Sequence, residues 1–296
     1  MMVAIKEGRM AFKGFETYYR ITNPEGKKAP LLLLHGGPGS THNYFEGFDK
    51  IAEALDRPII MYDQIGCGES ATPGHTELYN AEVWMDELEA IREHLGLEKI
   101  HLLGQSWGGM LAISYMMERD PKGVLSLILA STLHSAALWR EEQWRRIYRF
   151  MTKKERAIFN QAEASDKYDD PDYLKALDRF MALYCGPTVN EKSPEYLKRE
   201  KKNAGEVYTT AWGANEFGPT GTLARYDYRG QLGKITVPAL VTSGQMDLCS
   251  PYIAKSMADE LPNARWELFR DSRHMAFIEE EGRYFRLMAD WLKDFE

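Results

Sequence analysis

A serine set between glycines at the end of an apolar run is the feature that most constrains this chain. The segment Gly104-Gln105-Ser106-Trp107-Gly108 follows the run Ile100–Leu103, which predicts a buried strand, and precedes Met110–Met117, which predicts a helix. Glycine on both sides of the serine permits a turn too tight for side chains, and such a turn lifts the serine hydroxyl above the sheet. The short pattern also arises by chance. Its position between a strand and a helix favours a reactive serine at the end of a buried strand.

Strand and helix signals alternate on both sides of this turn. Apolar runs that predict strands are separated by an amphipathic helical segment, and an opening hairpin around Gly14 precedes them. Alternation of this kind predicts an α/β fold with a mostly parallel central sheet flanked by helices. The predicted elements are the hairpin strands Val3–Phe12 and Phe15–Ile21, the strands Leu31–Leu34, Pro58–Tyr62 and Val124–Ala130, and the helix Ala81–Leu95.

The alternation stops after Ser131 and resumes at Val237–Ser243. The intervening chain, rich in charged and aromatic residues, predicts helices and no strand. We therefore expect two core segments, residues 1–132 and 233–296, interrupted by a helical cap at 133–232. Basic runs in the insertion are expected to be solvated helix faces. The predicted cap helices include Glu141–Met151, Asp172–Tyr184 and Pro194–Asn203; the core resumes with the helix Pro251–Leu261, the strand Arg265–Phe269 and the helix Glu279–Phe295; the basic runs are Lys153-Lys154 and Lys198–Lys202.

Composition narrows the classes of partner. The 296 residues carry a formal net charge of −7, which disfavours nucleic acid because phosphate binding needs a basic face. No apolar stretch reaches the length of a membrane span, and Met1–Met10 lacks the apolar core of a signal peptide, so no membrane partner is expected. The cysteines Cys67, Cys185 and Cys249 show neither metal-ligand spacing nor a disulfide framework, which favours a cytoplasmic protein without a metal site. The oligomeric state stays open.

A serine hydroxyl becomes a strong nucleophile only with a base that takes its proton and an acid that orients the base. With a nucleophile in this kind of turn, the chain order is serine, then an acid, then histidine. Asp247 and His274 follow the last two predicted strands, so both lie on strand-end loops, where catalytic groups of open α/β sheets gather. An aspartate in a glycine-containing turn is often only a turn residue, and His274 is one of seven histidines. Order and placement together predict a triad of Ser106, Asp247 and His274.

Acyl transfer at Ser106 also needs two backbone N–H groups aimed at the developing oxyanion. We expect one from Trp107, directly after the nucleophile, and one from Gly37 in the loop His35-Gly36-Gly37-Pro38-Gly39. His35 could serve as a second base. A structural role, bracing this loop by a hydrogen bond, is the favoured interpretation.

These motifs together resemble the proline iminopeptidases (prolyl aminopeptidases), which are serine peptidases of the α/β-hydrolase fold. The resemblance covers the whole chain. It implies release of an N-terminal residue, typically proline, from short peptides or amides, without a metal or another cofactor and beneath a helical cap. The segments that carry it are His35-Gly36-Gly37-Pro38-Gly39, Tyr62-Asp63-Gln64-Ile65-Gly66-Cys67-Gly68-Glu69-Ser70, Gly104-Gln105-Ser106-Trp107-Gly108-Gly109, Gly244-Gln245-Met246-Asp247, Asp271-Ser272-Arg273-His274, and Asn215-Glu216-Phe217 with Gly221-Thr222.

The resemblance implies that Glu216 binds the free α-amino group of the substrate. Some members of the family carry a second glutamate directly after the triad aspartate, where this chain has Leu248. This departure leaves room for other small N-terminal residues. The alternatives are an amino-acid amidase, an esterase or a lactonase of the same fold, and a non-catalytic binding module. A degraded triad would signal the binding module, whereas all three triad residues are present here.

Overall fold

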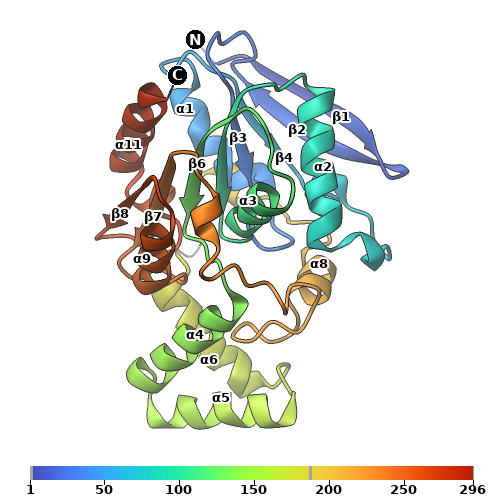
Figure 1. Ribbon diagram of the computed structural model, residues 1–296. Coiled ribbons are helices and arrows are strands. Elements are labelled where there is room, and N and C mark those ends of the chain that lie inside the picture. Colours follow the sequence, from blue (N-terminus) through green and yellow to red (C-terminus); the bar gives the residue numbers. More distant parts are fainter. Residues whose placement is uncertain (1–2, 187–188, 296) are drawn as a thin grey trace.

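The computed structural model describes residues 3–186 and 189–295. Within them, one sheet of eight strands forms the centre of the molecule, in the order β1-β2-β4-β3-β5-β6-β7-β8 (Figure 1). The pairs β1–β2 and β2–β4 are antiparallel, and all later neighbours are parallel, which confirms the predicted mostly parallel sheet. The strands are β1 (Ile5–Phe12), β2 (Phe15–Thr22), β3 (Leu31–Leu34), β4 (Ile59–Tyr62), β5 (Ile100–Gln105), β6 (Val124–Ala130), β7 (Ala239–Gly244) and β8 (Ala264–Phe269).

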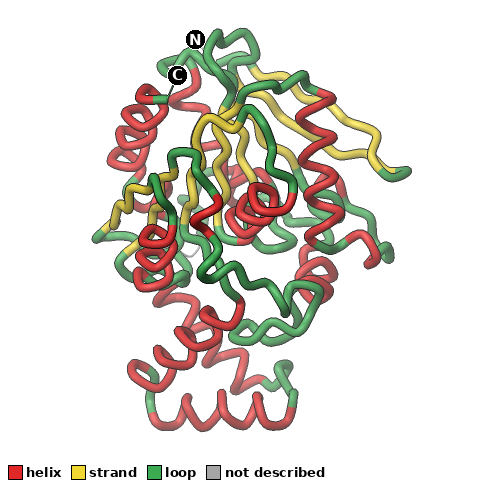
Figure 2. The backbone as a smooth tube through the Cα atoms, viewed as in Figure 1, coloured by secondary structure: helices red, strands yellow, loops and turns green. Residues whose placement is uncertain are grey.

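Helices cover both faces of the sheet (Figure 2). The four leucines of β3 are all buried, and they alternate between two apolar clusters, with Leu32 and Leu34 in one and Leu31 and Leu33 in the other. The first cluster includes residues of α2 (Ala81–His94), α3 (Trp107–Glu118) and α9 (Pro251–Glu260), and the second includes residues of α1 (Asp49–Ala52), α10 (Ala276–Glu279) and α11 (Glu281–Asp294). A strand that is buried on both faces has a continuous apolar run in the sequence, so such strands can be predicted from the sequence. Short 3₁₀ helices span His42–Phe48, Gly68–Ser70, Thr76–Leu78 and Leu232–Lys234.

Five α-helices lie between β6 and β7 in the described chain, with no strand among them. The helix predicted over Glu141–Met151 begins earlier, because the Ser135 hydroxyl caps its first turn by accepting the Leu138 N–H. Figure 1 shows α4, α5 and α6 projecting away from the sheet. The boundaries of a cap at residues 133 and 232 remain a prediction. The five helices are α4 (Ala136–Phe150), α5 (Lys153–Ser165), α6 (Pro171–Tyr184), α7 (Glu195–Lys198) and α8 (Ala204–Ala211).

The single helix predicted over Pro194–Asn203 is wrong. α7 ends at Lys198, and Arg199 is extended with φ −60° and ψ 141°. The Arg199 guanidinium pairs with Glu46 of the core, and Asn203 adopts a left-handed conformation with φ 61°. Contacts with the core therefore override the local helical tendency, and the basic run Lys198–Lys202 is not one solvated helix face. No helix within residues 3–186 and 189–295 has the length and hydropathy needed to cross a membrane.

Candidate active site

The predicted site residues follow the parallel strands of the sheet. The loop 35–40 follows β3, Ser106 follows β5, Asp247 follows β7 and His274 follows β8. Since the carboxyl ends of parallel strands lie along one edge of the sheet, this topology brings segments far apart in sequence to the same edge.

Ser106 lies in a strained turn between β5 and α3. Its φ is +55° and its ψ is −122°, a combination that non-glycine residues rarely adopt. The turn is held by the Ser106 N–H, which donates to the Ala130 carbonyl at 2.9 Å. A Cβ on Gly104 would lie 2.2 Å from the Gly108 carbonyl oxygen, and one on Gly108 would lie 2.0 Å from the Leu34 oxygen. The structure confirms that glycine is required on both sides of the serine.

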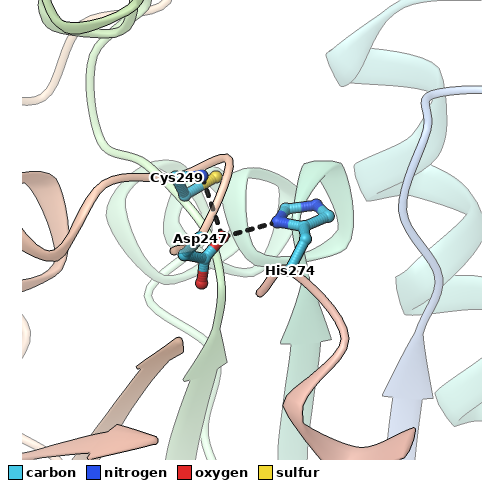
Figure 3. Close-up of side chains that lie close together, drawn as sticks. All are labelled: Asp247, Cys249 and His274. Carbon is cyan, nitrogen blue, oxygen red and sulfur yellow. Dashed lines mark hydrogen bonds and ion pairs between the residues drawn. The ribbon is translucent and has the colours of Figure 1, made fainter. Parts of the chain in front are cut away.

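Asp247 and His274 form a buried hydrogen-bonded pair (Figure 3). The His274 Nδ1 lies 2.8 Å from Asp247 Oδ1. The carboxylate also accepts the N–H groups of Gly244 at 3.0 Å and Cys249 at 2.9 Å. Because a carboxylate only accepts, Nδ1 must carry the proton, and the Nε2 of the neutral ring is then left with a lone pair. This tautomer is the one that a general base needs.

A cavity of about 230 Å³ brings the predicted residues together. Ser106, His274 and Glu216 line it, together with the two predicted oxyanion residues Gly37 and Trp107. Among the described residues, no hydrogen bond joins Ser106 to His274. In free enzymes such contacts are often loose and tighten when substrate binds. The predicted nucleophile and the predicted base thus line one cavity, without a hydrogen bond between them.

The glycine-rich loop lies close to the nucleophile. A Cβ on Gly36 would lie 3.0 Å from the Ser106 Cβ. The Gly36 N–H donates to the Tyr44 hydroxyl, so it is not available to a substrate oxygen. Within the described chain, the N–H groups of Gly37 and Trp107 have no acceptor. Both residues line the cavity, which is where an oxyanion hole is needed.

His35 has the bracing geometry expected from the sequence. Its Nε2 accepts the Gln64 N–H at 3.0 Å, and its Nδ1 lies 2.9 Å from the Gly36 carbonyl oxygen. Burial lowers the pKa of His35 to about 4, so the ring is neutral at pH 7. Gln64 also accepts the indole N–H of Trp107 at 2.7 Å. The histidine and the glutamine therefore tie the glycine-rich loop to the residue after the nucleophile.

Glu216 is held at the cavity wall by three aromatic residues. Its backbone carbonyl accepts the indole N–H of Trp139 at 3.0 Å and that of Trp212 at 3.1 Å. Its carboxylate accepts the Tyr208 hydroxyl. Removal from water raises the pKa of Glu216 to about 7, while the Tyr208 hydrogen bond and His274 oppose the rise. A carboxylate that ionises at a cost in a half-dry cavity favours a cationic partner.

Asp247, Cys249 and His274 offer three ligand atoms within 4.8 Å of one another, a set that could hold a metal ion. The chemistry of these donors fits hydrogen bonding better. Burial raises the pKa of the Cys249 thiol well above its usual value, so the sulfur keeps its proton and is a poor metal ligand. The Asp247 oxygen is already shared by two N–H donors, one of them on His274.

Sequence reasoning missed several residues that shape the site. Tyr44 donates to Gln105 at 2.9 Å, and Gln105 in turn donates to the His274 carbonyl at 3.4 Å, so the two link the glycine-rich loop to the histidine loop. Gln105 belongs to the serine motif, and this position was the only indication in the sequence that it lies at the site. The sequence did not indicate which aromatic residues contact Glu216: Trp139 lies 77 residues before it in the chain, whereas Tyr208 and Trp212 lie within eight residues of it.

Known proteins resemble this chain along nearly its whole length. The profile of a family described as alpha/beta hydrolase fold matches residues 29–281. A proline iminopeptidase of Clostridioides difficile is 57% identical, with 97% of this chain and 98% of that protein covered. One from Lactobacillus acidophilus is 52% identical, with the same coverage. The solved proline iminopeptidase of Mycobacterium smegmatis superposes with a TM-score of 0.85 at 30% identity over 98% of each chain.

Proposed function

This chain belongs to the proline iminopeptidases of the α/β-hydrolase family, and from that premise we propose that it is a serine aminopeptidase that releases N-terminal proline from short peptides or amides. The observation that carries the proposal is the cavity in which Glu216 faces the same space as Ser106. A carboxylate at that place binds the free amine and sets the distance to the scissile carbonyl. An enzyme with this arrangement cleaves after the first residue.

In the proposed mechanism, His274, oriented by Asp247, removes the proton of Ser106 as its oxygen attacks the carbonyl of the N-terminal residue. The N–H groups of Gly37 and Trp107 bind the oxyanion of the tetrahedral intermediate. His274 then protonates the leaving amine. Water, activated by the same ring, hydrolyses the acyl-enzyme and regenerates the serine.

The apolar part of the cavity suits the side chain of proline. Met110, Leu133, Trp139 and Leu248 contribute to its wall. Leu248 occupies the position of the second glutamate in some relatives, and its side chain is buried at 5% exposure. We therefore propose that Glu216 is the carboxylate that binds the substrate amine here, aided by neighbouring carbonyl groups.

The nucleophile is tested by Ser106→Ala. Turnover of proline 4-nitroanilide should fall at least a thousandfold, because the oxyanion hole and substrate binding alone leave only a small residual rate. A fluorescent active-site phosphonate should label the wild type and leave the variant unlabelled. Activity within tenfold of the wild type would end the assignment of Ser106.

A substrate panel separates the peptidase from the broader amidase, esterase or lactonase. It compares the anilides of proline, alanine and N-acetylproline with a simple ester and a lactone. The proposal predicts the highest kcat/KM for the unblocked proline anilide. Equal rates for blocked and unblocked proline would contradict binding of the amine by Glu216.

We also propose a cytoplasmic location and a short peptide or amino-acid amide as the partner. The thiols Cys67, Cys185 and Cys249 are all free, which suits a reducing compartment. Fractionation of the native host cells, followed by assay of proline anilide hydrolysis, tests the location. Activity recovered outside the cytoplasm would overturn it.

A further inference from the structure

A second cavity of about 590 Å³ adjoins the first. Five residues line both: Tyr44, Met181, Cys185, Lys201 and Met275. Glu216 lines only the first cavity. A substrate whose amine lies at Glu216 and whose carbonyl lies at Ser106 therefore has the second cavity available for the part that leaves. Met275 directly follows the residue that protonates the leaving amine, which supports this direction.

Lys201 is the charged residue at the boundary between the cavities. Within the described residues, no carboxylate lies within 4.0 Å of its ammonium group. The second cavity also has Arg199, which is already paired with Glu46 and Glu195, and the exposed Asp178, which does not line the first. Lys201 is an exposed residue, yet neighbouring protein atoms replace part of the water around its ammonium group and lower the pKa of that group, with Cys185 opposing the change. A cation beside the substrate cavity that has no carboxylate partner favours an anionic ligand.

The segment that carries Lys201 is attached to the core on both sides. Arg199 pairs with Glu46 on one side, and the Lys202 carbonyl accepts the Gly68 N–H at 3.1 Å on the other. The Asn203 side chain donates to the Gly66 carbonyl at 3.0 Å. This fastening sets the position of the backbone that carries Lys201 before substrate binds, so only the side chain has to be ordered on binding.

The same segment also abuts the glycine-rich loop. A Cβ on Gly39 would lie 2.6 Å from the Ala204 carbonyl oxygen. Lys201 is therefore carried close to the loop that supplies the Gly37 N–H. The first substrate residue after the scissile bond must lie beside the proposed oxyanion hole, and therefore near this segment.

We propose that Lys201 binds the C-terminal carboxylate of a dipeptide, so that dipeptides with N-terminal proline are the preferred substrates. The inference rests on the proposed function. One extended residue spans about 3.5 Å, so the carboxylate of the leaving amino acid lies just beyond the scissile bond. A cation at the boundary of the two cavities meets the carboxylate there, while Glu216 meets the amine at the other end.

The wild-type enzyme tests this first, with prolyl-alanine and prolyl-alanine amide as substrates. The two differ only in the terminal charge. A charge-assisted contact predicts a kcat/KM about tenfold to a hundredfold higher for the free acid. Equal values, or a preference for the amide, would overturn the role of Lys201. Absence of turnover on both, and on proline anilide, would instead refute the proposed function.

Lys201→Met supplies the second test, with Lys202→Met as the matched control. Lys202 pairs with Glu69 and lines neither cavity. The ratio of kcat/KM for the acid over the amide should fall about tenfold in Lys201→Met and stay at the wild-type value in Lys202→Met. A ratio that does not change in Lys201→Met would overturn the proposal. Labelling by the active-site phosphonate measures the amount of active enzyme in each preparation.

Discussion

Two single residues at this site adopt states that are unfavourable for the stability of the folded protein. Ser106 is held at a positive φ, and Glu216 is a carboxylate whose ionised form is disfavoured by its surroundings. Neighbouring residues maintain both features. Gly104 and Gly108 allow the close backbone packing around the serine, and Tyr208 donates a hydrogen bond to the glutamate. Strain and unfavourable ionisation of this kind persist where the surrounding structure fixes them, as at many functional sites.

The pKa of Glu216, raised to about 7, predicts a pH dependence of substrate binding. As the pH falls through 7, the carboxyl group becomes neutral and loses its attraction for a cationic amine. The KM for proline anilide should therefore rise at least fivefold between pH 8 and pH 6. In Glu216→Gln, the KM should be high and independent of pH over this range. Steady-state kinetics at fixed ionic strength measure both.

An ester of N-acetylproline is the control for that experiment, because it has no free amine for Glu216 to bind. If the KM for this blocked substrate rises as much as that for the anilide, the titration does not belong to amine binding by Glu216.

Among the elements, α4 couples the helical insertion to the loop that carries Asp247, the proposed triad acid. Gln143 and Arg146 both donate to the Leu248 carbonyl, at 2.9 Å and 3.1 Å. Glu142 accepts the Ser250 hydroxyl at 2.7 Å. The buried Arg146 guanidinium also lies over the Tyr184 ring of α6, 4.6 Å from its centroid. The loop after Asp247 is thus held from the insertion as well as from the sheet.

Arg146→Met should lower kcat at least tenfold, because the loop next to Asp247 loses a donor and the His274 ring loses part of its support. The free energy of unfolding should fall by about 2 kcal/mol, as is usual when a buried carbonyl loses a charged donor. Arg149→Met is the matched control, since Arg149 is exposed on the same helix. A kcat for Arg146→Met within threefold of this control would show that α4 does not position the acid loop.

At the scale of the whole molecule, a buried carboxyl group joins three separate segments. Glu87 of α2 is fully buried and accepts hydrogen bonds from Thr17 of β2 at 2.5 Å and from the Ile65 N–H, in the loop after β4, at 2.9 Å. Desolvation raises its pKa to about 8, against the opposing effect of these donors. Glu87 is therefore protonated in the folded protein at pH 7 and ionised in the unfolded chain.

This difference predicts that stability falls as the pH rises. The folded state binds one more proton than the unfolded state between the ordinary glutamate pKa and about 8, so the contribution is present at low pH and lost as the pH rises through 8. In Glu87→Gln the loss is absent. Relative to the wild type, the variant should gain on the order of 4 kcal/mol in unfolding free energy between pH 5 and pH 9.

Urea unfolding of both proteins at the two pH values measures this gain. The contribution of Glu216 is common to both proteins and cancels in the comparison. Parallel pH profiles for the wild type and Glu87→Gln would contradict the assignment to Glu87.

The sequence by itself determined the sheet, the chain order of the predicted triad residues and the glycine requirements around Ser106. Buried strands, tight turns and chain order are local properties, and they are written in runs such as Leu31–Leu34 and in single positions such as Gly108. Only the tertiary structure decided that Arg146 supports the acid loop, that Trp139 contacts Glu216, and that Lys201 leaves a predicted helix to line two cavities. Those outcomes depend on contacts between segments far apart in the chain, whose geometry no local pattern specifies.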